Sequence, residues 1–572
     1  MDRPCTPTPD ADWKASISVI NLFDSSERQQ FLSDTRGLLR GGKAVLGTGL
    51  LKGGTPGEHL ASARNLARYG ASMTGLLEAG TARFPERIAL VDDEGELTYR
   101  QLRTQARLTA HVLASRGITE KSRVGILARN GRGFMVPLSA KGYLGYTVFL
   151  LNVGASKQQL HDIAVEHKLD VIFADSEFDE NLPTDVEGLT LVHAWAGPDH
   201  RTDIDFPTIQ DLWAAPGDQD DSLPKKVNQG GVVLMSSGTS GTPKAVNHSE
   251  PMLPFGVIGP PLEAFPVTAG CTLQVTASMF HVLGWGVSVI ALMAGCRIVT
   301  QRVFDPEKVL QQVDEYKCDG IISSAVFLKD QLAFDVANPG KYDHSSVKFI
   351  MNAGNAMSED LVLGLEEQYG YILGSGYGST EGLLVAFAGP EDLKADPNTA
   401  GYPVWNGRLE VLGEDGKPVA PGEVGIIHAR NVMSMEGYLG NRDAAEEIDG
   451  MLNLGDKGVI DPESGRLRVL GRDNDMIIVG GENIWPSSVS DLICKMDGVD
   501  DAYCVGVEDE KTFQRVKAYV VLDGTTEVSE DDVRSHIEHN LIVPAIPRDV
   551  VLQTEALPRN AIGKVVKRDL VG

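Results

Sequence analysis

Residues 234–246, LMSSGTSGTPKAV, combine the hydroxyl, glycine and lysine residues that bind phosphate. The apolar segment GVVLM, 231–235, precedes them and predicts a strand. Glycine lets backbone N–H groups approach an anion closely, and hydroxyls donate further hydrogen bonds to phosphate oxygens. The candidate polyphosphate contacts are therefore Ser236, Ser237, Gly238, Thr239, Ser240, Gly241 and Lys244.

The spacing within this loop excludes a Walker A motif, in which a glycine directly precedes Lys-Ser/Thr. Here Thr242 and Pro243 separate Gly241 from Lys244, and Ala245 follows the lysine. On these residues alone, a Ser/Gly-rich surface loop after a strand remains the alternative. The loop indicates polyphosphate binding of a kind unlike that of the P-loop NTPases.

Two further motifs offer groups that suit a nucleotide. GSGYGSTEG, 374–382, places Tyr377, Thr380 and Glu381 together. A tyrosine ring stacks on a purine, and a carboxylate holds Mg²⁺ against phosphate oxygens. In NLGDKG, 453–458, the two oxygens of Asp456 are able to accept both ribose hydroxyls. A solvated turn is the alternative for each motif.

Two motifs near the C-terminus carry cations. GRDNDMIIVGGENI, 471–484, holds Arg472 and then the glycine pair Gly480–Gly481. PRNAIGKVVKRDL, 558–570, holds Lys564 directly after a glycine, where a mobile surface lysine is the alternative. Each of these signals is weak alone, so their value lies in their order along the chain.

The elements that must position these residues follow an α/β pattern. Apolar runs alternate with amphipathic helical stretches from about residue 98 onward, which predicts doubly wound layers with largely parallel strands. In such sheets ligands bind beyond the carboxyl ends of the strands, where the hydroxyl-rich loop falls. The runs are VGILA (124–128), VFLLN (148–152), VIFAD (171–175), GIISS (320–324) and VKFIMN (347–352), and the helical stretches KQQLHDIAVEH (157–167), PEKVLQQVDEY (306–316) and SEDLVLGLEEQYG (358–370).

The pattern of predicted helices and strands changes twice toward the C-terminus. Short alternating strands with turn pairs over 407–470 predict an antiparallel β subdomain, and the last hundred or so residues predict a small α+β domain. We expect an N-terminal extension over 1–75, a large domain over 76–472 and a mobile small domain over 473–572. Residues 37–57 are rich in glycine, which favours a plain flexible arm over a weak surface anchor.

The composition of the chain limits the classes of binding partner that we expect. The formal net charge of −27 argues against nucleic acid and acidic membrane surfaces. The six cysteines form no CxxC pair, which suits reduced thiols and a cytoplasmic location. The stretch 264–296 lacks Asp, Glu, Lys and Arg, and its glycines and proline predict a buried helix with its approach loop and not a membrane span. Oligomerisation and weak peripheral membrane contact are left open.

Taken together, these motifs resemble the adenylate-forming superfamily, and within it bacterial fatty-acid–CoA ligases, over about residues 76–572. The resemblance implies a large domain that holds ATP and a carboxylic acid, and a small domain that rotates between two steps. The carboxylate attacks the α-phosphorus of ATP to give acyl-AMP and pyrophosphate, and the CoA thiolate then displaces AMP. ATP, Mg²⁺ and CoA are the implied cofactors.

The resemblance also implies a role for each motif. Carboxylate attack needs charge neutralisation more than a base, because the nucleophile is already ionised. The implied roles are Lys564 as the catalytic cation between carboxylate and α-phosphate, Lys244 with the loop hydroxyls on the β- and γ-phosphates, Glu381 on Mg²⁺, Thr380 on the α-phosphate, Tyr377 against adenine, Asp456 and Arg472 on ribose, and Gly480–Gly481 along the pantetheine channel.

The acid is indicated by MFHVLGW, 279–285, which matches the family's aromatic–His element. Amino-acid-activating members carry an aspartate there, and Phe280-His281 stands without one. Trp285 aligns with an indole gate of some long-chain ligases, a core tryptophan being the alternative. Gly354 and Gly376 would complete the wall. A medium- or long-chain fatty acid is therefore expected, with an aryl or short-chain acid, or a non-catalytic nucleotide-binding scaffold, as the alternatives.

Three positions depart from the family pattern. Leu454 replaces the hydroxyl residue before Gly-Asp, which removes one hydrogen bond near the nucleotide. Asn474 stands at the expected hinge, where Asp or Lys is usual, and Ala245 replaces a glycine after Lys244. The block inserted after the Glu motif in fatty acyl-AMP ligases, which serve carrier proteins, is absent between Gly382 and Gly401, and this favours CoA as the acceptor.

Overall fold

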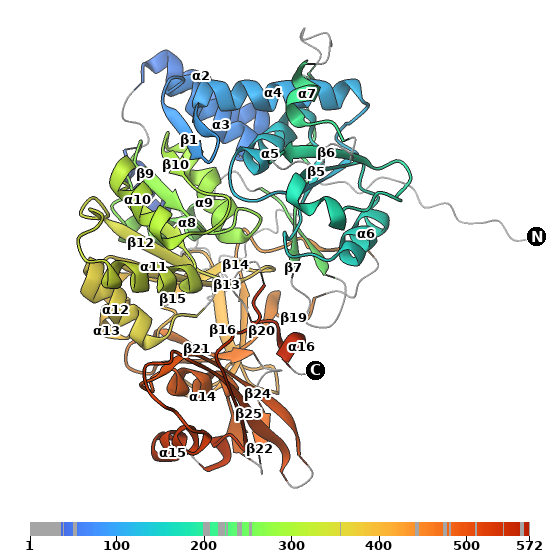
Figure 1. Ribbon diagram of the computed structural model, residues 1–572. Helices are drawn as coiled ribbons and strands as arrows, with labels where there is room; N and C mark the ends of the chain where they lie inside the picture. Colours follow the sequence, from blue (N-terminus) through green and yellow to red (C-terminus); the bar gives the residue numbers. More distant parts are fainter. Residues whose placement is uncertain are drawn as a thin grey trace, which may run out of the picture.

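Four sheets organise the chain, and the computed structural model shows them in two unequal bodies (Figure 1). The described residues are 36–37, 39–49, 54–197, 206–214, 223–224, 227–236, 243–250, 254–354, 356–440, 445–472, 477–479, 482–509, 512–541, 543–560 and 565–570.

The nine-stranded sheet has a parallel centre with antiparallel edges. Its inner strands are apolar and buried along most of their length, as expected for strands covered on both faces. In spatial order it comprises β15 (Tyr402–Pro403), β14 (Leu383–Ala388), β13 (Leu373–Ser379), β12 (Phe349–Ala353), β11 (Gly320–Ser323), β9 (Thr272–Val275), β10 (Arg297–Val299), β1 (Ile88–Asp92) and β2 (Gly95–Thr98).

The seven-stranded sheet repeats this plan. Five of its strands are parallel, and β8 and β18 close one edge in antiparallel fashion. Its order is β18 (Gly437–Leu439), β8 (Lys244–His248), β7 (Val232–Ser236), β4 (Thr147–Leu150), β3 (Arg123–Leu127), β5 (Val171–Asp175) and β6 (Thr190–Trp195).

Helices cover both sheets, and many begin at a side-chain cap. Thr98 with Gln101, and Ser156 with Gln159, form capping boxes, and Asp305 caps a helix whose first residue is Pro306. The helices of the large body are α2 (Pro56–Tyr69), α3 (Met73–Arg83), α4 (Tyr99–Ser115), α5 (Arg132–Leu144), α6 (Lys157–Glu166), η1 (Ser176–Asn181), α7 (Ile209–Ala214), α8 (Phe255–Ala264), α9 (Val282–Met293), α10 (Pro306–Tyr316), α11 (Ala325–Ala337), α12 (Glu359–Tyr369) and α13 (Pro390–Ala395).

A β subdomain and a small α+β unit complete the chain. The subdomain contains β16 (Arg408–Leu412), β17 (Gly425–Arg430), β19 (Glu447–Ile448), β20 (Met451–Ile460) and β21 (Leu467–Arg472). The small unit contains β22 (Ile477–Val479), β23 (Glu482–Ile484), α14 (Pro486–Ile493), β24 (Val499–Asp509), β25 (Phe513–Leu522), α15 (Glu530–Asn540), η3 (Val543–Ala545), β26 (Asp549–Gln553) and α16 (Lys567–Leu570).

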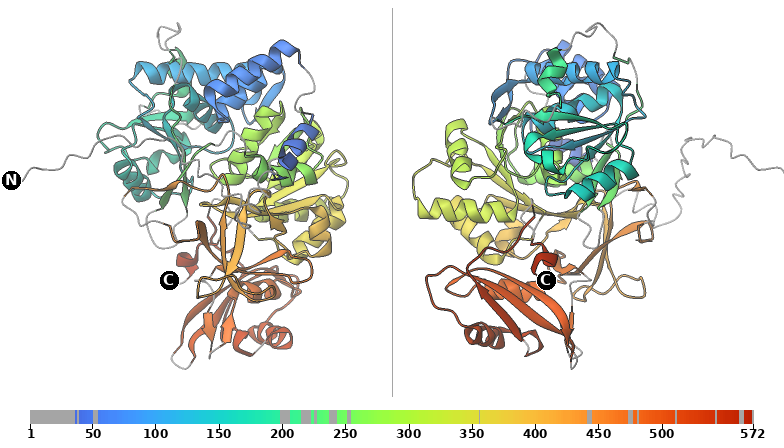
Figure 2. Two further views of the ribbon diagram at one scale, coloured as in Figure 1. Left: turned by 180° about the vertical axis from the view of Figure 1, so that it is seen from behind. Right: turned by 45° about the vertical axis from the view of Figure 1, so that its right-hand side comes forward.

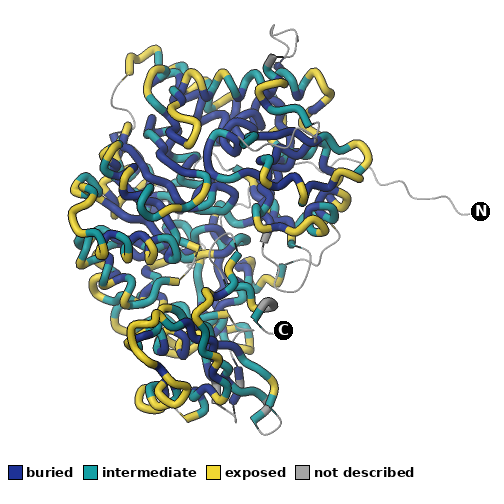
Figure 3. The backbone as a smooth tube through the Cα atoms, in the orientation of Figure 1, coloured by how far each residue is buried: buried dark blue, intermediate teal, exposed yellow. Residues whose placement is uncertain are grey.

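The predicted fold class is thus confirmed. The largest buried cluster joins α3, α4, α5 and α9 to both large sheets, which explains why the buried backbone in Figure 3 concentrates in the large body. The helices predicted at 306–316 and 358–370 lie within a residue of α10 and α12. The uncharged stretch 264–296 contains strand β9 as well as the predicted buried helix, α9. Among the described helices, none is long and apolar enough to cross a membrane.

The prediction of a plain flexible arm over 37–57 was wrong where the structure describes it. Residues 36–37 and 39–47 are helical, and the views in Figure 2 place this first blue helix against the green part of the chain. Its buried residues Gly37, Gly41 and Val45 recur every four positions, which puts them on one helix face. Here the glycines permit close packing.

Candidate active site

A cavity of about 400 Å³ lies between the two large sheets, within the range of small-molecule sites. It is bordered by predicted site residues that lie in or next to α9, β12, β13 and β21, far apart in the sequence. These are His281, Trp285, Gly354, Gly376, Tyr377, Thr380 and Arg472. The structure therefore brings together at one cavity seven residues that the sequence proposed separately for the acid, the nucleotide and the ribose.

His281 occupies the N-cap position of α9 and has a neutral ring at physiological pH. Burial lowers the pKa of His281 to about 4, well below the usual value near 6.5. Its ring lies 4.2 Å from that of Phe280, centroid to centroid, and its Nε2 has no hydrogen-bond partner among the described residues. A neutral imidazole at this place can donate one hydrogen bond but cannot neutralise a carboxylate.

Trp285 lies one turn further along α9, and its backbone N–H donates to the His281 carbonyl over 2.9 Å. The side chain is 4% exposed; it borders the cavity and belongs to the largest core cluster. The sequence left a gate and a core tryptophan as alternatives for Trp285. The position of the side chain, buried in the core and bordering the cavity, is compatible with both. Whether the indole moves stays a prediction.

Tyr377, Asp456 and Arg472 form one hydrogen-bonded group. The Tyr377 hydroxyl donates to Asp456 Oδ2 over 2.7 Å, and Arg472 Nε lies 3.0 Å from Asp456 Oδ1. Burial, and then the Asp456 carboxylate, raises the pKa of Tyr377, which keeps the hydroxyl protonated as a donor. Arg472 also donates to the carbonyl of Leu454 over 3.0 Å, so this backbone group is bonded although the residue lacks the family's hydroxyl.

The turn between β13 and β14 carries Thr380, which lines the cavity, and the adjacent Glu381. Its tightness depends on Gly378, where an added Cβ would lie 1.5 Å from the carbonyl oxygen of Leu383. Leu383 itself has φ +54°, an uncommon conformation for a branched side chain. Such strain at a loop that carries site residues is typical of functional turns.

Glu381 is linked to β8, the strand that follows the candidate phosphate loop, through a tyrosine that the sequence analysis missed. The Tyr438 hydroxyl donates to Glu381 Oε1 over 3.1 Å, and Lys244 Nζ lies 4.9 Å from the centre of the Tyr438 ring. Burial and the Glu381 carboxylate raise the pKa of Tyr438, so it remains a donor. Pairing of β18 with β8 creates this arrangement, and no local sequence motif predicts that pairing.

His248 is a second residue that the sequence analysis missed. It is fully buried, with Nε2 2.8 Å from the carbonyl oxygen of Thr380 and Nδ1 3.2 Å from that of Met433. Burial lowers the pKa of His248 despite these carbonyls, and a neutral ring has a single N–H to donate. The residue joins the end of β8 to the Thr380 turn, and so positions the turn from behind.

Part of the predicted site lies outside the described residues. This holds for Lys564, for Ser237, Gly238, Thr239, Ser240 and Gly241 of the loop, for Gly480–Gly481 and for the hinge at Asn474. The two ends of the loop are described: Ser236 pairs in register with Lys244 across β7 and β8. The exposed Lys244 therefore stands at the end of a hairpin that holds both ends of the loop side by side.

The described residues suit a Mg²⁺ ion that is bound together with a nucleotide. No cluster of three or more His, Cys, Asp or Glu side chains suited to a metal occurs within the described ranges. Mg²⁺ bound with a nucleotide needs only one or two carboxylates, since phosphates and water supply its other ligands. Glu381 has one oxygen bonded to Tyr438, and its second oxygen, which has no hydrogen bond among the described residues, could serve as that ligand.

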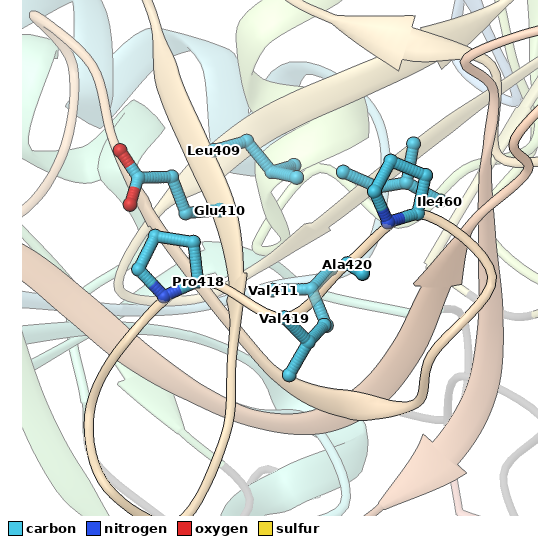
Figure 4. A pocket seen from close by; sticks show the side chains of 8 residues that line it. Leu409, Glu410, Val411, Pro418, Val419, Ala420 and Ile460 are labelled. Atoms are coloured by element: carbon cyan, nitrogen blue, oxygen red, sulfur yellow. The ribbon is translucent and has the colours of Figure 1, made fainter.

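A second hollow, in the β subdomain, does not compete for this role (Figure 4). It measures about 100 Å³, below the size of ordinary ligand sites. Its lining contains one charged residue, Glu410, and no cation for a phosphate. The lining residues are Leu409, Glu410, Val411, Pro418, Val419, Ala420, Pro421 and Ile460.

The chain is similar to known CoA ligases over most of its length. The chain is 29% identical over 511 residues to an indoleacetate–CoA ligase of Aromatoleum aromaticum, covering 87% of this chain and 95% of the relative. It is 26% identical to a Rhodococcus jostii CoA ligase named for a 7a-methyl-1,5-dioxo-octahydro-indenyl propanoyl group, covering 86% of this chain and 97% of the relative.

Among solved structures, o-succinylbenzoate CoA synthetase of Bacillus subtilis, in complex with its acyl-adenylate, has the same fold. The TM-score is 0.73 at 23% identity, over 87% of this chain and 98% of that one. The family model described as AMP-binding enzyme matches residues 77–439, and that for the AMP-binding enzyme C-terminal domain matches residues 489–564. The chain belongs to the AMP-binding enzyme family, as the motifs predicted.

Proposed function

We propose that this chain is an AMP-forming acid–CoA ligase whose acid has a long apolar body, in the first place a medium- or long-chain fatty acid. Membership of the family gives the general reaction, which passes through an acyl-adenylate and uses ATP, Mg²⁺ and CoA. The choice of acid rests on the cavity.

The shape of the cavity is the observation that carries the proposal. It runs beside α9 from His281 at one end to Met293 and Ala294 at the other. The 12 residues of this helix span about 18 Å. Polar groups gather at the His281 end, with Tyr377 and Thr380, while the far end is apolar. A single aromatic ring fills a fraction of that length, whereas an extended alkyl chain uses all of it. The far-end residues are Val267, Leu273, Val289, Ile290, Met293 and Cys296.

An acidic residue on the cavity wall would repel the substrate unless it were neutralised. Glu250 borders the cavity, and its Oε2 lies 2.6 Å from Lys141 Nζ in a pair whose side chains are 9% and 1% exposed. This buried pair removes a net negative charge from the wall. The carboxylate of the acid then enters at the polar end with its apolar body along α9.

Adenylation requires a cation at the reacting groups. His281 is neutral near pH 7, so charge neutralisation falls to lysines and to Mg²⁺, which supplies a positive charge on the phosphates when bound. We assign the reacting carboxylate and α-phosphate to Lys564, and the β- and γ-phosphates to Lys244 and the 236–242 hydroxyls. Residues 473–572, moving about Asn474, would deliver Lys564 and later open the Gly480–Gly481 channel to CoA.

An acid with a ring system is the second candidate. The relatives named above are ligases for indoleacetate and for a bicyclic propanoyl group, and the structural neighbour is one for o-succinylbenzoate. A fused ring with a short side chain would occupy the cavity from the His281 end past Trp285. A cavity of this size therefore admits a bulky ring acid as well as an alkyl chain.

A coupled assay separates the candidates. Pyrophosphate release and thioester formation are measured for straight-chain acids from acetate to C20, and for benzoate, indoleacetate and a bicyclic propanoate, each with and without CoA. We expect kcat/KM to rise with chain length and thioester to appear only with CoA. A preference for the ring acids would move the assignment to the second candidate. If ATP binds but no acid in the series causes pyrophosphate release, the result would favour a nucleotide-binding scaffold without turnover.

A further inference from the structure

The helix formed by residues 36–37 and 39–47, here called the N-terminal helix, packs along α8, and α8 is a wall of the acid cavity. Six residues from α8 and the position before it border the cavity: Pro254, Phe255, Val257, Ile258, Pro261 and Leu262. The N-terminal helix lies before residue 77, where the family model begins. It therefore contacts α8 from a part of the chain that the family model does not cover.

The contact between the two helices is close and extends along α8. An added Cβ on Gly41 would lie 2.3 Å from the backbone oxygen of Phe255, at the start of α8. An added Cβ on Gly259, one turn further, would lie 3.1 Å from the Cα of Gly41 and 2.4 Å from the Trp405 ring. Both glycines are thus required by backbone packing, since no side chain fits between the helices.

Polar contacts fix the other end of the helix pair. Arg40 Nε donates to Glu263 Oε1 over 3.2 Å, and a second contact joins its terminal nitrogen to Glu263 Oε2. The Arg40 guanidinium also lies 4.3 Å from the centre of the Trp405 ring. Beyond α8, the Ala269 N–H donates to the carbonyl of Thr48 over 2.8 Å. The N-terminal helix is therefore held at the start, middle and end of α8.

α8 has little stability of its own. Its sequence, FGVIGPPLEA, contains two glycines and two prolines in ten residues. Pro260 and Pro261 lack the N–H groups that would bond to earlier carbonyls, and glycine lowers helix propensity. A short helix of this composition forms only where tertiary packing holds it. One of its faces borders the cavity, and the N-terminal helix and Trp405 supply packing on the other side.

We propose that the N-terminal helix is a specificity element of the acid site: by fixing α8 from outside, it sets how large an apolar acid the cavity accepts. Gly41, Arg40 and Glu263 are positioning residues in this proposal, and none of them borders the cavity. The proposal rests on the proposed function in one respect, that the acid body lies in this cavity.

The chain offers a matched pair of variants. Gly41→Ala inserts a methyl group against the Phe255 carbonyl, whereas Gly47→Ala places it where nothing lies within 4 Å. Both changes replace glycine by alanine in the same helix. A second set tests the ion pair: Arg40→Glu, Glu263→Arg and the double variant that restores the pair with reversed charges. Circular dichroism and the melting temperature establish that each variant is folded.

Three measurements are made on the full chain. Hydrogen exchange reports the protection of amides in 255–264, a fluorescent polyene fatty acid reports binding without turnover, and the coupled assay gives KM for acids of increasing size. We expect Gly41→Ala to speed exchange in α8 and to weaken polyene binding and raise KM for the largest acids roughly tenfold or more, because the wall is displaced. KM for ATP and for the smallest acid should stay within about twofold, well under the 1.4 kcal/mol of a tenfold change. Gly47→Ala should match the wild type, and the double charge reversal should recover what each single reversal loses.

Unchanged exchange and unchanged polyene affinity in Gly41→Ala and both single charge variants would overturn the proposal. Faster exchange in α8 with unchanged polyene affinity would overturn it too, because α8 would then not decide what the cavity binds. If the wild-type chain ligates no acid, the proposed function fails separately. The exchange and polyene measurements still judge the role of the N-terminal helix in that case.

Discussion

The Tyr377 hydroxyl donates a 2.7 Å hydrogen bond to Asp456, a residue 79 positions later in the chain. Arg472 contacts the other oxygen of the same carboxylate, over 3.0 Å. The two partners fix the orientation of Asp456, whose side chain is 10% exposed. We assign this carboxylate to the ribose hydroxyls, so its orientation should govern how well the nucleotide binds.

Removal of the Tyr377 hydroxyl tests that arrangement. A hydrogen bond to a charged group contributes about 1.5–3 kcal/mol, so we expect Tyr377→Phe to raise KM for ATP by roughly tenfold or more. The rate at saturating ATP should change little, because the ring that we assign to adenine remains. Initial rates over a range of ATP concentrations measure both quantities. An ATP KM equal to that of the wild type would remove Tyr377 and Asp456 from the nucleotide site.

Lys564 is predicted to act in the transition state. Lys564→Ala should slow adenylation by roughly a hundredfold or more and leave ATP affinity nearly unchanged, because the lost charge acts only where negative charge develops. Single-turnover release of pyrophosphate measures the adenylation rate, and equilibrium binding measures the affinity for ATP. Lys567→Ala, at an exposed position of α16, is the control. A normal adenylation rate in Lys564→Ala would contradict the assignment.

Glu381 should determine the response to Mg²⁺. Glu381→Ala removes the one carboxylate assigned to the metal, so half-maximal activity should need roughly tenfold more Mg²⁺. Tyr438→Phe keeps the carboxylate but removes its 3.1 Å hydrogen bond, and should produce a smaller shift in the same direction. A Mg²⁺ titration in the coupled assay gives the Mg²⁺ concentration for half-maximal activity of the wild type and of each variant. If Glu381→Ala titrated like the wild type, Glu381 would be a turn residue only.

Sequence reasoning found the residues whose chemistry is local to a motif. Asp456, Arg472 and Thr380 stand in short glycine-rich segments, and the structure places them at or beside one cavity. Tyr438 escaped it because pairing of β18 with β8, almost two hundred residues earlier, brings it to Lys244. His248 escaped it because its partners, the carbonyls of Thr380 and Met433, lie 132 and 185 residues later. The interpretation of Gly41 was wrong. Glycine in this segment was interpreted as a source of flexibility, whereas here it allows close contact with the backbone of Phe255.

The neutral state of His281 gives a pH dependence with a definite sign. Its pKa is about 4 in the folded chain and near 6.5 when unfolded, so the unfolded state takes up the proton first as the pH falls. The stabilisation is complete above pH 6.5 and is lost progressively toward pH 4, about 1–3 kcal/mol in all. His281→Gln, which cannot titrate, should lose less stability between pH 7.5 and 5 than the wild type in denaturant unfolding. Parallel losses in the two proteins would show that His281 is not desolvated.

The buried pair of Lys141 and Glu250 should be costly to break on one side only. The side chains are 1% and 9% exposed, so Lys141→Met leaves Glu250 charged without its partner and should destabilise the chain by about 3–5 kcal/mol. The double variant Lys141→Met with Glu250→Leu removes both charges and should regain most of that loss. Because it adds apolar surface to the cavity wall, it should not raise KM for a long acid, whereas Lys141→Met alone should raise it through the uncompensated carboxylate. Unfolding curves and the acid series, run on both variants, measure the two effects, and equal stability of the single and double variants would show that the ion pair does not neutralise the wall.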